Sequence, residues 1–208
     1  MIHLLFDMDG CLIDSAEVQK AAFFGSYAAV VGDDKCPTYK EYLKYTGDSV
    51  DNVFKKMGLP LEMAPIYRQI SANSIDKVSV YWDIIKVIHD LRQYGCKIGI
   101  CTGKDHYRAE AILNYYHIDS YFDIIVGADD IDEPKPSPLP VLYAIKKLNI
   151  DKNDTILIGD GYNDILCAKN ASIRSILTLW YGDNGVPREA DYTVHTAVEL
   201  KTMLFELL

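Results

Sequence analysis

The sequence has no excess of basic residues. Its 208 residues include 21 Lys and Arg against 30 Asp and Glu, so the formal charge is -9 and the isoelectric point is near 4.9. A surface that binds nucleic acid needs basic stripes to neutralise phosphates, and this composition argues against one. Apolar runs approaching the roughly 20 residues of a membrane span are also absent, as is a charged segment ahead of the apolar N-terminal stretch. We therefore expect neither nucleic acid nor a membrane as a partner.

Cysteine and histidine are few and scattered. The five cysteines form an odd set without metal-ligand spacing, and none of the five histidines pairs at helical spacing as zinc ligands would. Such a set is typical of a reduced, cytoplasmic protein. The 49% of apolar and 25% of charged residues are ordinary for a globular chain, which is long enough for one domain with a large insertion or for two small domains. Monomer and homodimer both remain open.

Between residue 16 and about residue 78 the sequence has no convincing strand. Several short helical patterns fill this stretch, and glycines separate them. It contains eight Lys or Arg and eight Asp or Glu, so it is neutral and the remaining residues carry the whole charge of -9. This shift in composition predicts a separate helical domain, residues 16–78, inserted into a core domain made of residues 1–15 and 79–208.

The core domain shows an alternating pattern. An apolar run at residues 3–6 is typical of a buried central strand. From residue 82 onward helical and strand patterns alternate, which predicts parallel strands, right-handed crossovers and an α/β three-layer sandwich of the Rossmann-like type. The strands are expected at 97–101, 122–126, 155–158 and 172–179, and the helices at 83–94, 104–116, 138–148, 162–168 and 197–208. Thr196 is expected to cap the last helix.

The first fifteen residues hold the densest chemistry. Asp7 and Asp9 follow the first strand, and Gly10 allows the chain to turn so that both carboxylates face one small volume. Acids at the carboxyl end of a buried parallel strand lie where open α/β sheets bind their ligands. A solvated acidic turn is the alternative when this stretch is taken alone.

Three later stretches also stand where predicted strands end. Thr102 and Gly103 come before a helix whose first N–H groups can hold an anion, although the glycine spacing excludes a Walker P-loop. Lys135 is held among three prolines. Asp160 and Asp164 are acids four residues apart among glycines, and hard cations such as Mg2+ bind oxygen ligands of this kind. A helix cap, a solvated lysine and an acidic turn are the alternatives for each stretch alone.

Together the four stretches resemble the haloacid dehalogenase superfamily of phosphatases. The resemblance rests on FDMDGCLIDS, CTGK, the lysine of EPKPSP and IGDGYND, in that order. It covers nearly the whole chain, because the helical segment is similar to the small cap domain that the family inserts between its first two motifs. The segments Trp180-Tyr181-Gly182 and Ala190-Asp191-Tyr192 resemble those of the phosphoglycolate phosphatase-like branch.

The resemblance implies a Mg2+-dependent phosphatase that hydrolyses a small-molecule phosphate monoester through an aspartyl-phosphate. Asp7 would be the nucleophile, and Asp9 would be the general acid and then the base that activates water. Thr102, Gly103 and Lys135 would bind the phosphoryl group. The partner implied is a small phosphorylated metabolite.

The resemblance also implies a metal site. Asp160, with Asp7 and the backbone carbonyl of Asp9, would hold Mg2+, and Asp164 would support the metal from the same loop. A phosphate dianion with three ionised aspartates totals -5, and Lys135 with Mg2+ reduces this to -2, against -4 without the metal. Each uncompensated pair of negative charges at contact distance costs on the order of 4 kcal/mol at an effective dielectric near 20. Activity without metal should therefore be negligible.

Two alternative functions use similar residues. A phosphosugar mutase of the same fold shares Asp9, but Gln19 stands where those enzymes carry a histidine, and their cap arginine is absent near residues 46–48. A receiver-like phosphoacceptor module of signalling proteins uses acids, a hydroxyl, a lysine and Mg2+, but its phosphoacceptor lies on a later strand and it has no cap. Simple hydrolysis is therefore the favoured function.

The helical cap should select the substrate. Its tyrosines can stack on a ring, although at helical spacing most are expected to be packing residues; they are Tyr27, Tyr39, Tyr42, Tyr45 and Tyr67. Further candidates for contact with the leaving group are Glu17, Lys20, Thr46, Asn73 and Lys77.

Overall fold

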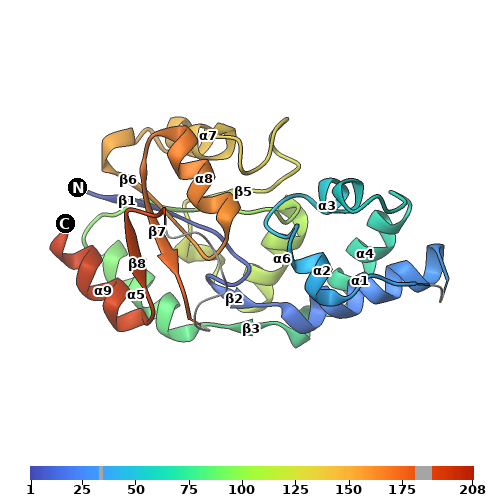
Figure 1. Cartoon of the computed structure of the whole chain (residues 1–208). Helices are drawn as coiled ribbons and strands as arrows, with labels where there is room; N and C mark the ends of the chain where they lie inside the picture. The colour runs from blue at the N-terminus through green and yellow to red at the C-terminus, as the bar shows by residue number, and fades with distance from the viewer. Residues whose placement is uncertain (33–34, 181–188) are drawn as a thin grey trace.

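The fold is organised around a six-stranded parallel sheet. The protein is described by a computed structural model covering residues 1–32, 35–180 and 189–208. The strand order is β5-β4-β1-β6-β7-β8 (Figure 1). The strands are β1 (His3–Phe6), β4 (Ile98–Cys101), β5 (Ile124–Val126), β6 (Thr155–Gly159), β7 (Arg174–Thr178) and β8 (Tyr192–Val194). The predicted Rossmann-like α/β architecture is confirmed.

Helices cover both faces of the sheet. One face packs against α5 (Trp82–Arg92), α6 (His106–Tyr115) and α9 (Ala197–Glu206). The opposite face packs against α7 (Leu139–Leu148) and α8 (Tyr162–Ala171), as Figure 1 shows. Short 3-10 turns lie at η1 (Ile75–Lys77), η2 (Asp119–Tyr121) and η3 (Lys152–Asp154). The result is a three-layer body in which none of the described helices is long and apolar enough to cross a membrane.

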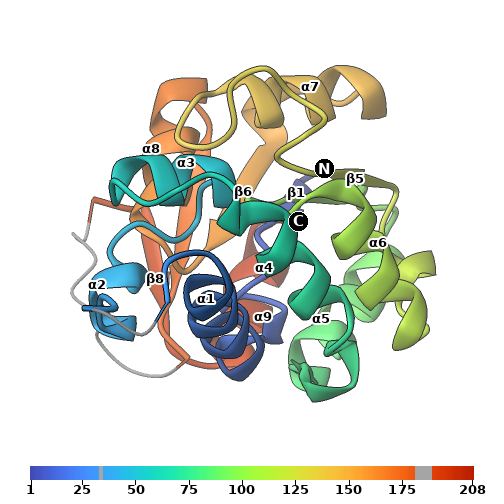
Figure 2. The same cartoon turned by 90° about the vertical axis from the view of Figure 1, so that its right-hand side faces the viewer.

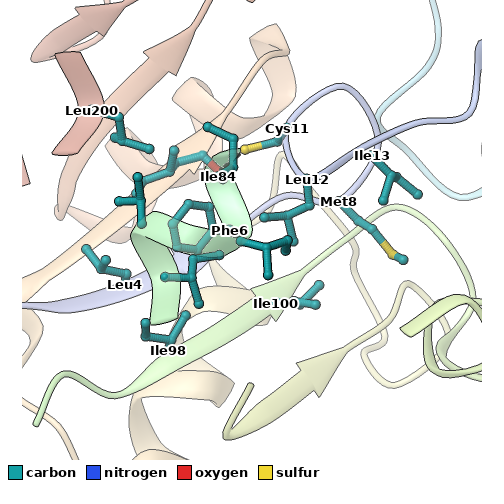
Figure 3. Packing of buried hydrophobic residues seen from close by; sticks show 14 of the residues in the cluster. Leu4, Phe6, Met8, Cys11, Leu12, Ile13, Ile84, Ile98, Ile100 and Leu200 are labelled. Atoms are coloured by element: carbon teal, nitrogen blue, oxygen red, sulfur yellow. Dashed lines mark hydrogen bonds between the residues drawn. The ribbon is translucent and has the colours of Figure 1, made fainter. Parts of the chain in front are cut away.

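Strand β1 lies at the centre of this body, and its side chains pack into the hydrophobic clusters on both faces of the sheet. Leu4 and Phe6 pack into the cluster on the α5 side, together with Ile98 and Ile100 of β4 (Figure 3). Leu5, which points the other way, packs into the cluster on the α7 and α8 side. All three β1 side chains are fully buried. A strand buried on both faces explains why residues 3–6 form a mostly apolar run, with Leu4, Leu5 and Phe6 in succession.

Four helices form a second group with its own apolar cluster. They are α1 (Ala16–Val30), α2 (Tyr39–Leu43), α3 (Val50–Lys56) and α4 (Met63–Ala72). Phe23, Phe54 and Met63 are fully buried in this cluster. The view in Figure 2 looks onto this group, which lies over one end of the sheet. The expected succession of short helices was wrong for residues 16–30, which form one helix: Gly25 does not interrupt it but packs closely against Ile70 of α4.

A two-stranded antiparallel ribbon joins the helical group to the body. It consists of β2 (Ile13–Asp14) and β3 (Ser79–Val80). The two segments in which the chain passes between the body and the helical group therefore lie side by side. Neither strand was predicted, because two residues are too few to show a period. Strand β8 was also missed. Other elements begin and end within a few residues of their expected positions, and the predicted cap of α9 is confirmed, since Thr196 Oγ1 accepts a hydrogen bond of 3.1 Å from Glu199 N–H.

We expect Leu5→Ala to destabilise the protein by about 2–5 kcal/mol, because it opens a cavity beneath the central strand. Val198→Ala is the control, since Val198 is 74% exposed, and its effect should stay within about 0.5 kcal/mol. Urea unfolding followed by circular dichroism measures both. Equal losses in the two variants would contradict the central position given to β1.

Candidate active site

The carboxyl ends of three neighbouring strands meet at one cavity of about 610 Å³. Asp7 follows β1, Thr102 follows β4 and Asp160 follows β6, and all three line it, as Asp9 and Asp164 do. The cavity lies between this edge of the sheet and the helical group, which supplies its opposite wall. The structure therefore brings together acids and a hydroxyl that are up to 157 positions apart in the sequence.

Gly10 permits the close approach that this edge requires. Its φ of +76° lies in the left-handed region, which disfavours other residues, and a Cβ at this position would lie 2.1 Å from Asp160 Oδ2. The turn after β1 thus packs directly on the Asp160 carboxylate. The predicted turning role of Gly10 is confirmed, and any side chain here would push Asp160 away from Asp7.

Lys135 joins two of the acids. Its side chain is only 1% exposed, and its Nζ donates a hydrogen bond of 2.7 Å to Asp7 Oδ1 and another to Asp164 Oδ1. Asp164 Oδ2 also accepts a hydrogen bond of 3.0 Å from Gly161 N–H. The ammonium contacts both carboxylates, so loss of Lys135 would leave two buried acids without their shared cation.

The acids of this edge would carry more negative charge than Lys135 offsets if Asp7, Asp160 and Asp164 were all ionised. Burial, together with the neighbouring carboxylates of Asp164 and Asp9, raises the pKa of Asp7 to about 7, although Lys135 opposes the shift. Burial and the charges of Asp7 and Asp164 raise the pKa of Asp160 well above its usual range. The edge therefore favours an additional cation.

The donor set fits such a cation. Carboxylate oxygens of Asp7, Asp160 and Asp164 lie within 4.8 Å of one another. Hard divalent ions such as Mg2+ prefer oxygen ligands, and usually bind through one or two carboxylates while keeping water. Three ionised carboxylates against the single positive charge of Lys135 would leave negative charge that a divalent ion offsets, so the donor set suits such an ion.

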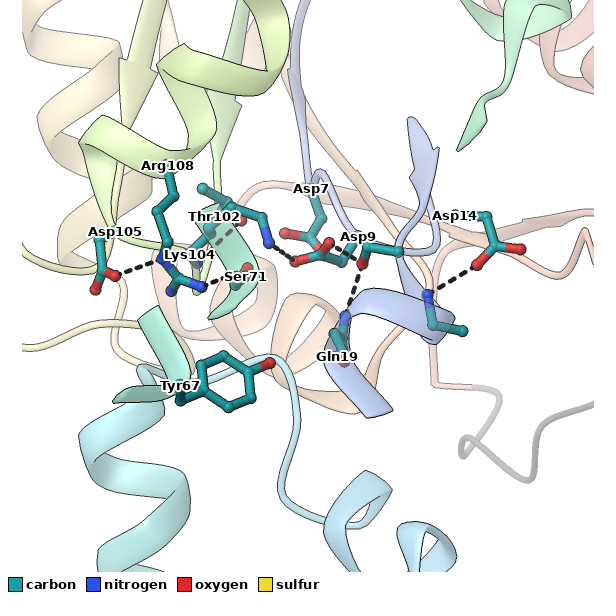
Figure 4. Close-up of polar contacts among 12 residues, drawn as sticks. Asp7, Asp9, Asp14, Gln19, Tyr67, Ser71, Thr102, Lys104, Asp105 and Arg108 are labelled. Carbon is teal, nitrogen blue, oxygen red and sulfur yellow. Dashed lines mark hydrogen bonds and ion pairs between the residues drawn. The ribbon is translucent and has the colours of Figure 1, made fainter. Parts of the chain in front are cut away.

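Asp9 lies in a different environment from Asp7. Lys104 Nζ lies 3.0 Å from Asp9 Oδ2, and the Ser15 hydroxyl donates to Asp9 Oδ1 (Figure 4). Gln19 Nε2 in turn donates a hydrogen bond of 2.9 Å to Ser15 Oγ. Burial alone would raise the pKa of Asp9, but Lys104, Ser15 and Arg108 together hold it below its usual value. The surroundings thus raise the pKa of Asp7 and lower the pKa of Asp9, although both acids belong to the segment FDMDG.

The helical group contributes both aromatic and backbone groups to the cavity. Tyr39, Tyr42 and Tyr67 line it, and the hydroxyl groups of Tyr42 and Tyr67 lie 2.9 Å apart. Tyr27 does not line it and packs in the apolar cluster of the helical group, where Tyr45 also packs. Two of the five tyrosines therefore do not line the cavity.

The loop after α2 contacts the body at the rim of the cavity. Asn163 Nδ2 donates a hydrogen bond of 3.3 Å to the carbonyl oxygen of Thr46, and Thr46 lines the cavity. A Cβ on Gly103 would lie 2.8 Å from the Asp48 carbonyl oxygen, so glycine permits this approach. The other proposed contacts of the leaving group are exposed and do not line the cavity; they are Glu17, Lys20, Asn73 and Lys77.

Comparisons with known proteins agree with this geometry. A family model described as haloacid dehalogenase-like hydrolase matches residues 4–178. The chain belongs to this family. A protein of Bacillus mycoides named pyrophosphatase PpaX is 30% identical over 182 residues, which cover 85% of this chain and 83% of that protein. The relative of Bacillus velezensis with the same name is 30% identical over 183 residues.

Solved structures show the same fold. A predicted phosphatase from Clostridium acetobutylicum has 25% identity and a TM-score of 0.83, over 99% of this chain and 98% of that chain. A structure described as a putative phosphoglycolate phosphatase from Lactobacillus plantarum has 21% identity and a TM-score of 0.86 over the whole of both chains. The expectation of a haloacid dehalogenase-type phosphatase is confirmed, and the receiver-like alternative is wrong.

Three contributors to this haloacid dehalogenase-like site were missed in the sequence. Lys104 was visible in CTGK but was assigned no contact with Asp9, and Ser15 was visible in FDMDGCLIDS but was likewise assigned none. In the structure the N-terminal turn of α1 is bonded by Asp14, whose Oδ1 accepts a hydrogen bond of 3.0 Å from Ala16 N–H. Arg108 carried no signal except its spacing of four residues from Lys104. Of the branch-specific segments, Tyr181 and Gly182 lie outside the described residues.

We expect Lys135→Met to destabilise the metal-free protein by about 3–5 kcal/mol, because Asp7 and Asp164 lose their buried cation. Excess Mg2+ should recover part of this loss by supplying positive charge to the same acids. Urea unfolding in EDTA and in Mg2+ measures both effects.

The matched control is Lys169→Met, since Lys169 Nζ lies 3.2 Å from Glu189 on the exposed surface. It should cost no more than about 1 kcal/mol and should not respond to Mg2+. Similar small losses in both variants would show that Lys135 does not hold the acids of the site.

Proposed function

We propose that this chain is a Mg2+-dependent phosphatase that hydrolyses a small-molecule phosphate monoester through an aspartyl-phosphate formed on Asp7. The observation that carries the proposal is the position of Asp7: its carboxylate is held by Lys135 at a cavity that Asp9, Thr102 and Asp160 also line. A carboxylate nucleophile must be held in place, with positive charge next to the phosphoryl group that it attacks. It also needs a proton donor near the leaving group. These requirements match the groups around the cavity.

Asp7 and its neighbours would bind and orient the phosphoryl group. Lys135 Nζ supplies positive charge next to Asp7. Thr102 Oγ1 accepts a hydrogen bond of 3.2 Å from the Lys104 N–H, so its own hydroxyl hydrogen remains available to a phosphoryl oxygen. Together these donors would hold the phosphorus in line with the Asp7 carboxylate, which is the main source of catalysis in phosphoryl transfer.

Asp9 would move the protons. A bound phosphoryl dianion adds negative charge beside Asp9 and raises its pKa, which favours the protonated form. Asp9 would then give that proton to the leaving oxygen and afterwards take a proton from the water that attacks the aspartyl-phosphate. Ser15 and Lys104 fix the orientation of the Asp9 carboxylate through both of its oxygens.

Asp7, Asp160 and the backbone carbonyl of Asp9 would hold Mg2+, with Asp164 supporting it. When bound, the ion offsets the charge of the acids and of the phosphoryl oxygens. The support for this site is the raised pKa of Asp7 and of Asp160 together with the 4.8 Å spread of the three side-chain carboxylates.

We propose that residues 16–78 act as a cap over residues 1–15 and 79–208. The ribbon of β2 and β3 is a suitable hinge, because it contains both segments in which the chain passes between the body and the helical group. The contact between Asn163 and Thr46, and the approach of Gly103 to Asp48, support closure of the cavity by the cap. Closure would exclude water while the aspartyl-phosphate forms.

The compartment and the substrate belong to the same proposal. All five cysteines are free, which supports a reduced, cytoplasmic setting. The names of the relatives, pyrophosphatase and phosphoglycolate phosphatase, support a small phosphorylated metabolite as substrate.

Purified protein with Mg2+ should release phosphate from p-nitrophenyl phosphate, and EDTA should abolish the release. Asp7→Asn should lower kcat at least about 1,000-fold, because it removes the nucleophile. Asp9→Asn should lower it about 100- to 10,000-fold and should accumulate phosphoenzyme, since water is no longer activated. Steady-state assays and acid-quenched labelling measure these effects.

Asp83→Asn is the control, because Asp83 is an exposed carboxylate at the start of α5 and does not line the cavity. It should leave the rate unchanged. Full activity of Asp7→Asn would exclude the aspartyl-phosphate route. Conversion of a sugar 1-phosphate to its 6-phosphate without net phosphate release would instead favour the mutase function.

A further inference from the structure

Two buried cations in the wall of the cavity are given no contact with the phosphoryl group in the proposed mechanism. Lys104 and Arg108 are 6% and 4% exposed, and both line the cavity. Of the lysine and arginine side chains that line it in the described ranges, the third, Lys44, is exposed. Burial of a cation is costly unless a counter-charge accompanies it, and each of the two has a carboxylate partner, Asp9 for Lys104 and Asp105 for Arg108.

Their contacts within the chain use only part of their donor capacity. An ammonium has three N–H donors and a guanidinium has five. Lys104 contacts Asp9, while Arg108 donates through Nε to Asp105 at 2.7 Å and through Nη1 to Ser71 at 3.3 Å. Figure 4 shows Lys104 reaching Asp9 and Arg108 reaching Ser71, with Tyr67 below them.

Arg108 is held in a rigid setting by both parts of the protein. Its guanidinium lies 5.7 Å from the centre of the Tyr67 ring. Asp105, its carboxylate partner, also accepts a hydrogen bond of 2.9 Å from Arg68 Nε. Asp105 thus has two guanidinium partners, and it stays compensated if Arg108 is shared with a ligand. Ser71, Tyr67 and Arg68 belong to α4, so a ligand on Arg108 would contact the cap and the core together.

The position of Lys104 determines how far a group bound to it would lie from the leaving oxygen of the substrate. Lys104 Nζ is 3.0 Å from Asp9 Oδ2, and in the proposed function Asp9 contacts the leaving oxygen. The leaving oxygen and Lys104 are then separated by about two hydrogen-bond lengths, roughly 6 Å. An anionic group attached one or two atoms from the leaving oxygen can therefore reach Lys104.

We propose that Lys104 and Arg108 form a second anion subsite, which selects substrates whose leaving group carries a carboxylate or a phosphoryl group one or two atoms from the leaving oxygen. This inference rests on the proposed function, because it takes Asp9 as the group that faces the leaving oxygen. Charge-assisted hydrogen bonds from a fixed guanidinium recognise both kinds of anion. A neutral leaving group would leave these donors without their ligand, and this penalty provides the discrimination.

The test compares three probes: 2-phosphoglycolate, inorganic pyrophosphate and 2-hydroxyethyl phosphate. The last replaces the carboxylate of the first by a neutral group of nearly equal size. Wild-type protein with Mg2+ should show a kcat/KM at least about 10-fold higher for one or both anionic probes than for the neutral one. The better anionic probe identifies the second group as carboxylate or phosphoryl.

Arg108→Gln should lower the ratio of anionic to neutral kcat/KM about 10- to 100-fold, and Arg108→Lys should restore part of it. Lys104→Gln should lower every rate, because it also contacts Asp9, but it should lower the ratio as well. Lys40→Gln removes an exposed cap charge that does not line the cavity, and it should leave the ratio unchanged. An unchanged ratio in Arg108→Gln, or no preference in wild type, overturns the subsite.

A binding measurement separates this result from failure of the phosphatase function. Isothermal titration of Asp7→Asn with 2-phosphoglycolate and 2-hydroxyethyl phosphate needs no turnover. Tighter binding of the anionic probe, lost on addition of Arg108→Gln, supports the subsite even if wild type hydrolyses neither compound. Hydrolysis of the neutral probe without any anionic preference in rate or binding leaves the phosphatase function standing and removes the subsite.

Discussion

The arrangement of the site depends on one buried ammonium between two buried carboxylates. Lys135 reaches Asp7 and Asp164 from a loop that comes 128 positions after Asp7 in the sequence. Without this cation the carboxyl ends of β1 and β6 would place acids together in a medium of low dielectric, where their repulsion is strongest. The same pairing keeps Asp7 in place and marks where the phosphoryl charge would enter. Stability and chemistry therefore rest on the same interaction.

The sheet supplies the precision that this pairing requires. Because β1, β4 and β6 are adjacent and parallel, their final residues lie at one edge, and each strand places one functional group there. Glycines then allow close approach where a side chain would intrude, as Gly10 does against Asp160. A site built on strand ends is held by the core beneath it, so side chains can be positioned within a fraction of an ångström.

The two acids of the first motif illustrate how position assigns a role. Burial and neighbouring carboxylates raise the pKa of Asp7 despite Lys135, whereas Lys104 and Ser15 outweigh burial at Asp9 and lower its pKa. Their side chains point into different surroundings although only Met8 separates them. In the proposed mechanism Asp7 acts as the nucleophile and Asp9 transfers the protons, in keeping with this difference. The cations beside Asp9 would extend the site toward the leaving group.

Much of the fold and of the candidate site could be predicted from short segments of the sequence. Alternating apolar runs predicted the parallel sheet, and Asp7, Asp9, Thr102, Lys135, Asp160 and Asp164 were recognisable because each stands in a distinctive short motif. Only the tertiary structure decided which residues meet without a local pattern: the β2–β3 ribbon, the contact of Lys104 with Asp9, and the position of Arg108 beside α4. It also decided which residues of the helical group line the cavity, because Tyr42, which lines it, and Tyr27, which does not, both follow a helical spacing. The physical reason is that motifs encode strand ends, whereas contacts across the cavity depend on how two separately packed groups of elements meet.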